Sequence, residues 1–284
     1  MHDQSMEMEF ARARALEFEP YTLFRVPAMT GRYLNVHPAG YRHGRRPFSW
    51  PPDPQEANVF VLGGSTAFGY GVADGETIAS QLGDQLGSPV YNFASPNYTS
   101  VQERIRFEQL LLQGHRPRVA VFVDGFDDFI APFYEPMMFA PFVTAAKRRR
   151  LFDRFLRREK PAGRMPDCAV VVDRYLTNMR LIKAAAQQFG VHPVFVWQPV
   201  PCYQYAGPAA DHGSSAPLIE CVQRGYEMMD ARRGGIDGLL WLADMQRGRT
   251  DALYIDPDHY TAAFSGEIAS RIGQHLVKTG WMRS

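Results

Sequence analysis

The stretch VFVLGGSTAFGYG, residues 59–71, decides the fold of this 284-residue chain. It opens with a short apolar run, typical of a buried strand, and two glycines follow where such a strand would turn. Ser65 stands at the tip of that turn. Glycines and small polar residues also make ordinary turns. The stretch alone therefore leaves Ser65 as either a turn residue or a nucleophile held at the end of a strand.

Strand and helix patterns alternate along the rest of the chain. Short apolar runs predict further strands within residues 88–94, 118–125 and 191–199. Amphipathic stretches predict helices at residues 77–86, 100–114, 168–190 and 260–280. We therefore expect an α/β fold, a three-layer sandwich with a parallel sheet of about five strands between helices. Ligands of such folds bind at the carboxyl ends of the strands, the edge where Ser65 stands.

The chain divides into an extension and a main domain. Residues 1–56, rich in aromatics and proline, are expected to pack as an N-terminal extension on the domain formed by residues 57–284. An insertion, residues 129–166, interrupts that domain after the third strand. Its apolar part, 129–145, could cover the Ser65 pocket or meet a partner. Its basic part, 147–160, is either an exposed helix with a packed apolar face or a membrane-surface contact.

Composition narrows the function classes. The net charge is +1, so the chain as a whole has no strong electrostatic attraction for nucleic acid. We expect a cytoplasmic protein as the chain stands, because it has no signal peptide and no membrane-spanning run, although an anchor could lie outside the given sequence. Three cysteines without short spacing argue against a disulfide framework and a zinc site. No histidine has metal-site spacing and no phosphate loop is complete, so no metal and no cofactor are assigned.

Asp256 and His259 stand three residues apart in YIDPDHY, residues 254–260, just before the last predicted helix. A serine nucleophile needs a base, and the base needs an acceptor that fixes its tautomer and orientation. One short turn could supply both if that helix packs near the first strand. We interpret Asp258, between them, as a solvated turn acid.

Four blocks in order resemble the SGNH (GDSL-like) hydrolase family: VLGGSTAFGYG, VYNFASPNYTSVQE, VFVDGFDDF and DPDH. The resemblance implies a serine esterase with Ser65 as nucleophile, His259 as base and Asp256 as its orienting acid. It implies an oxyanion or substrate site at Gly64, the Ser65 amide, Asn97 and Asp127. The substrate would be an O-acetylated carbohydrate or a lipid-like ester. A stretch from Asn35 to Arg42, N-x-x-x-x-G-Y-R, resembles bacterial relatives that act on envelope or polysaccharide esters.

The chain departs from the family pattern at two positions. Asn97 replaces a glycine, a mild change because asparagine tolerates left-handed backbone and keeps its N–H. Asp127 replaces the asparagine that donates to the oxyanion, and an ionised carboxylate cannot donate. Asp127 could be protonated, the site could work with two donors, or the protein could bind without hydrolysing. A binding or scaffold protein and an acyltransferase therefore remain alternatives, and the oligomeric state is open. We expect Asp128 to cap its turn and Asp124 to end its strand.

Overall fold

A computed structural model describes residues 4–130, 167–208 and 216–283. The predicted lid (129–145) and the basic segment (147–160) lie outside the described residues, apart from Phe129 and Ile130. Phe129 is fully buried and packs against the rings of Trp197 and Tyr226. It therefore belongs to the core and not to an inserted loop.

A five-stranded parallel sheet forms the centre of the molecule, as the sequence predicted. Its strands lie in the order β4-β3-β5-β6-β7. Their bounds are β3 (Val59–Gly63), β4 (Val90–Asn92), β5 (Val119–Asp124), β6 (His192–Trp197) and β7 (Leu239–Trp241). The sequence analysis did not locate β7, because a strand of three half-buried residues has too short a pattern to stand out.

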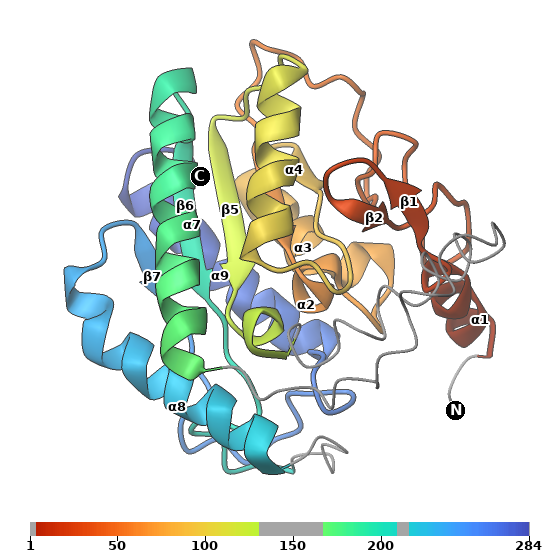
Figure 1. The fold of residues 1–284 in the computed structure, drawn as a ribbon. Helices are drawn as coiled ribbons and strands as arrows, with labels where there is room; N and C mark the ends of the chain where they lie inside the picture. The colour runs from red at the N-terminus through yellow and green to blue at the C-terminus, as the bar shows by residue number, and fades with distance from the viewer. Residues whose placement is uncertain (1–3, 131–166, 209–215, 284) are drawn as a thin grey trace, which may run out of the picture.

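Helices cover both faces of the sheet (Figure 1). On one face lie α3 (Ile78–Leu86) and α9 (Ala262–Lys278), and on the other lie α4 (Ser100–Leu112), α7 (Cys168–Phe189) and α8 (Ala216–Arg232). The predicted α/β sandwich is therefore confirmed. Helix α8 was not predicted. Its Gly225 faces the Phe129 ring, where a Cβ would come within 2.2 Å, so a packing requirement places a glycine inside this helix.

The N-terminal residues add elements that the sequence analysis missed: α1 (Gln4–Ala13) and the antiparallel pair β1 (Glu17–Glu19) and β2 (Leu23–Arg25). Further along, the Arg42 N–H donates to the Asn92 carbonyl at 2.8 Å. This contact gives β4 a partner on the outer edge of the sheet, where an unpaired strand would invite association.

The cysteines contradict the sequence analysis. Cys168, at the start of α7, forms a disulfide with Cys221 in α8, and only Cys202 is free. The expectation of no disulfide relied on the absence of short spacings. These two residues are 53 positions apart and meet only because α7 and α8 pack side by side.

Candidate active site

The strand order reverses between β3 and β5. The chain moves from β3 outward to β4 and then returns to the other side of β3, so the carboxyl ends of β3 and β5 form the switch point at which folds of this kind bind ligands. Ser65 follows β3 and Asp127 follows β5, so both stand at this switch point. The topology thus brings together two of the residues that the sequence singled out.

Glycines shape the turn that carries Ser65. Gly63 has a φ of 157°, and a Cβ there would lie 2.8 Å from the Val123 carbonyl oxygen on the next strand. Ser65 begins the short helix α2 (Ser65–Phe68), and Gly69 ends it in the left-handed conformation. This close strand-to-helix turn leaves the Ser65 side chain only half-buried among buried neighbours.

Arg42 anchors that turn from the N-terminal extension. Its fully buried guanidinium donates to the carbonyls of Phe68 (3.0 Å) and Gly69 (2.6 Å), and it pairs with Asp74 at 2.8 Å. These contacts hold α2 against the sheet. The sequence analysis noted the Asn35–Arg42 motif but did not assign this role, because the partners of Arg42 lie about thirty residues away along the chain.

Ser65, His259 and Asp256 form one hydrogen-bonded chain. The Ser65 Oγ lies 2.9 Å from His259 Nε2, and His259 Nδ1 lies 2.7 Å from Asp256 Oδ2. Asp256 Oδ1 also accepts the backbone N–H groups of Asp258 and His259, both at 2.9 Å. Burial alone would raise the pKa of Asp256. The hydrogen bond and charge of His259, together with these N–H groups, outweigh it, so the pKa lies below its ordinary value.

Tyr70 supports the histidine, a contact that the sequence analysis missed. Its ring lies 4.7 Å from the His259 ring at an angle of 36°, and the Phe10 ring of α1 lies 4.8 Å from the Tyr70 ring. The Arg14 guanidinium stands 5.1 Å from the Tyr70 centroid. Two residues of the N-terminal segment thus pack around the ring that contacts His259.

Asn97, which replaces a glycine of the pattern described above, occupies the left-handed conformation, with a φ of 67°. It follows Pro96 in a turn closed by the Tyr98 N–H and the Ser95 carbonyl at 3.1 Å. The next residue of this turn reaches the candidate oxyanion site, because the Tyr98 carbonyl oxygen is 3.2 Å from where a Cβ on Gly64 would stand. The replacement of glycine by asparagine therefore leaves the turn intact.

Asp127 lies directly over Gly64. A Cβ at Gly64 would stand 1.6 Å from Asp127 Oδ2, and the Ser65 N–H donates to the same carboxyl group. The side chain is buried, and Asp258, Asp128 and Asp124 add negative charge around it. These effects raise the pKa of Asp127 to about 8, although the Ser65 N–H opposes them. Asp127 is therefore mainly a neutral acid at pH 7, able to donate a hydrogen bond.

The other acids of this region have distinct places. Asp128 accepts from the N–H and the hydroxyl of Ser100, at the first turn of α4. Asp124 is the last residue of β5 and hydrogen-bonds to the buried Glu103. Burial raises the pKa of Asp124 to about 7, so this pair holds a proton near neutral pH. Asp258, interpreted above as a solvated turn acid, is in fact half-buried and its charge acts on Asp127.

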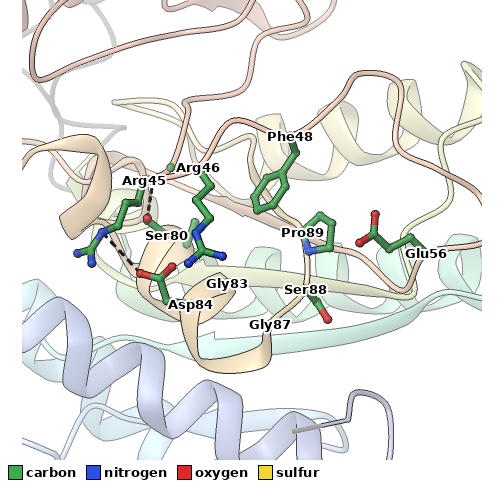
Figure 2. Close-up of a pocket in the computed structure, with 12 residues that line it drawn as sticks. Arg45, Arg46, Phe48, Glu56, Ser80, Gly83, Asp84, Gly87, Ser88 and Pro89 are labelled. Carbon is green, nitrogen blue, oxygen red and sulfur yellow. Dashed lines mark hydrogen bonds and ion pairs between the residues drawn. The ribbon is translucent and has the colours of Figure 1, made fainter.

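Cavities lie at both ends of the sheet. One of about 370 Å³ adjoins the triad and includes Tyr70 and Asp256 in its lining. Another of the same volume lies near the amino ends of β3 and β4, between Arg46, Phe48, Glu56 and Asp84 (Figure 2). The described residues around this second cavity include no histidine, so it offers no serine–base pair.

Within residues 4–130, 167–208 and 216–283, no group of three or more histidine, cysteine or acidic side chains is arranged to hold a metal ion. Over the same residues, no helix has the length and apolar character that a bilayer crossing requires.

Comparisons with known proteins agree with this architecture. No family model and no curated protein matches the sequence. Among solved structures, the chain is similar to a member of the lipolytic protein G-D-S-L family from Veillonella parvula, with 11% identity, a TM-score of 0.50, and coverage of 78% of this chain and 99% of that one. The chain has the fold of the SGNH hydrolases.

Two further solved structures are also similar to it. One is a family two carbohydrate esterase from Clostridium thermocellum in complex with cellohexaose, with 14% identity, coverage of 81% of this chain and 67% of that one, and a TM-score of 0.48. The other is a psychrotrophic esterase from Pseudoalteromonas sp., with 14% identity, coverage of 79% and 98%, and a TM-score of 0.46.

Proposed function

We propose that this protein is a serine esterase that hydrolyses a carboxylic ester through an acyl-enzyme. The observation that carries the proposal is the hydrogen-bonded chain from the Ser65 hydroxyl through His259 to Asp256, placed at the strand switch point. A neutral His259 takes the Ser65 proton as the oxygen attacks the ester carbonyl, and returns it to the leaving alkoxide. Asp256 keeps the ring in the required tautomer. Water then repeats the sequence on the acyl-enzyme.

Negative charge develops on the carbonyl oxygen during each attack. We assign its stabilisation to the Asn97 N–H and to the protonated Asp127 carboxyl, which the Ser65 N–H orients by donating to it. The burial of Asp127 supports this role because it keeps the acid neutral near pH 7. In this arrangement a carboxylic acid replaces the side-chain amide of the family pattern, and the substitution need not abolish hydrolysis.

Labelling with a fluorophosphonate probe tests the assignment, since the probe reacts with an activated serine. We expect the wild type to be labelled at Ser65 and to hydrolyse p-nitrophenyl acetate. Ser65→Ala and His259→Ala should lose both properties. Ser49→Ala, a change at an exposed serine outside the triad, is the matched control and should keep both. A folded wild type that is neither labelled nor active would favour a binding protein on the same fold.

A further inference from the structure

The cavity of about 370 Å³ beside the triad lies under the N-terminal helix α1. Its lining includes Met6, Phe10 and Ala11 from α1, and Tyr70, Ile255 and Asp256 from the two segments that carry the triad. The cavity therefore joins the N-terminal extension to the catalytic turns.

Helix α1 is held firmly enough to form a fixed wall. The Glu9 carboxylate accepts the backbone N–H groups of residues 32, 33 and 34, at 2.8, 2.8 and 2.9 Å. Phe10 is only 4% exposed and packs on Tyr70. The cavity thus exists before any ligand arrives, which lowers the entropic cost of binding there.

The charged groups around the cavity already have partners. Arg14 lies over the Tyr70 ring and hydrogen-bonds to its hydroxyl, Asp256 accepts from His259, and Glu7 also has a partner. The apolar part of the lining comes from the α1 side chains and from Ile255, which is 44% exposed, and the charged residues Glu7, Arg14 and Asp256 line the rest. This surface suits an uncharged, apolar group.

The position of the cavity indicates which part of a substrate it would take. The Tyr70 ring packs against the His259 ring at a tilted angle, and Asp256 is hydrogen-bonded to His259, so the cavity adjoins the histidine side of the site. His259 protonates the leaving oxygen, and the alcohol part of an ester therefore lies on that side. We propose that the α1 cavity binds the alcohol part of the substrate and that this alcohol is apolar. The inference depends on the proposed esterase function, and it selects a lipid-like ester over an O-acetylated sugar.

Acetate esters of increasing alcohol length test the proposal while the acyl group stays constant. We expect kcat/KM to rise from methyl to butyl to hexyl acetate, by up to about fourfold per methylene, the factor for burying one CH₂. Ala11→Trp should fill the cavity, because Ala11 is exposed and lines it. This variant should lose the dependence of kcat/KM on alcohol length. Met8→Trp, on the same helix but 62% exposed and outside the lining, should behave as wild type.

Direct binding separates this inference from the proposed function. Saturation-transfer NMR with 1-hexanol on the Ser65→Ala protein should show binding, which Ala11→Trp removes and Met8→Trp retains. If hexanol binds in this pattern but no ester is hydrolysed, the esterase proposal fails and the cavity assignment stands. If methyl acetate is hydrolysed but rates are flat with alcohol length and Ala11→Trp changes nothing, the cavity assignment is wrong.

Discussion

Replacing Asp127, which we propose as the oxyanion-site acid, by asparagine tests whether this side chain stabilises the charge that develops on the substrate carbonyl oxygen. The asparagine side chain is isosteric with the acid, and its carbonyl oxygen can accept the Ser65 N–H while its amide donates at every pH. The acid donates only when protonated, and its pKa of about 8 makes it about 90% neutral at pH 7 and about 10% neutral at pH 9. Because ionisation removes a donor and adds repulsion, wild-type kcat should fall about tenfold between the two pH values. Asp127→Asn should show no such fall.

The assay is kcat for p-nitrophenyl acetate from pH 5 to 10, with Asp127→Ala as the control. The alanine variant lacks the donor at every pH, and its kcat should be about 100- to 1,000-fold below that of Asp127→Asn throughout this pH range. An alkaline fall of the same size and midpoint in wild type and Asp127→Asn would refute the reasoning, because another group would then cause it.

The pH dependence of protein stability gives an independent test of the raised pKa of Asp127. The folded protein holds a proton on Asp127 that the unfolded chain, with a pKa near 3.8, releases at lower pH. The contribution of Asp127 to the free energy of unfolding of the wild type should therefore be largest below pH 4. It should fall by about 1.4 kcal/mol per pH unit as the pH rises toward 8. Asp127→Asn does not titrate. The free energy of unfolding of Asp127→Asn, measured by urea denaturation, should therefore increase relative to that of the wild type between pH 4 and pH 8.

Three further predictions concern the neighbours of the site. Asp258→Asn removes a negative charge near the oxyanion-site acid and so should lower its pKa and move the alkaline fall in kcat to lower pH; an unchanged midpoint would argue against this contact. Arg42→Met removes a fully buried guanidinium from its pair with the partly buried Asp74 and should cost about 3–5 kcal/mol of unfolding free energy in urea. The double variant with Asp74→Asn should recover part of this loss, and full stability in the single variant would contradict the prediction. Gly64→Ala should displace the oxyanion-site carboxyl and reduce kcat strongly, whereas Gly234→Ala, where a Cβ meets nothing within 4 Å, should not; equal rates in the two would show that the close approach is unimportant.

Local sequence patterns were enough to predict most of the scaffold. Four of the five strands and four of the long helices lie where apolar periodicity placed them, because burial on a sheet or along one helix face imposes a regular spacing. The same reasoning missed β7, α8 and the N-terminal elements. β7 is short, α8 contains a glycine required by the Phe129 ring, and α1 depends on Glu9 and Phe10 contacting residues far along the chain.

The sequence by itself determined which residue types could do chemistry. Ser65, Asp256 and His259 were singled out from short motifs, and Asn97 and Asp127 from the resemblance of such motifs to the SGNH family pattern. Only the tertiary structure decided the state of Asp127 and the surroundings of His259. The protonation of a carboxyl depends on burial and on nearby charges such as Asp258. The packing of the Tyr70 ring against His259 joins two residues that lie far apart in the sequence. Both depend on distances in space between residues that are far apart in the sequence, and the sequence does not give those distances.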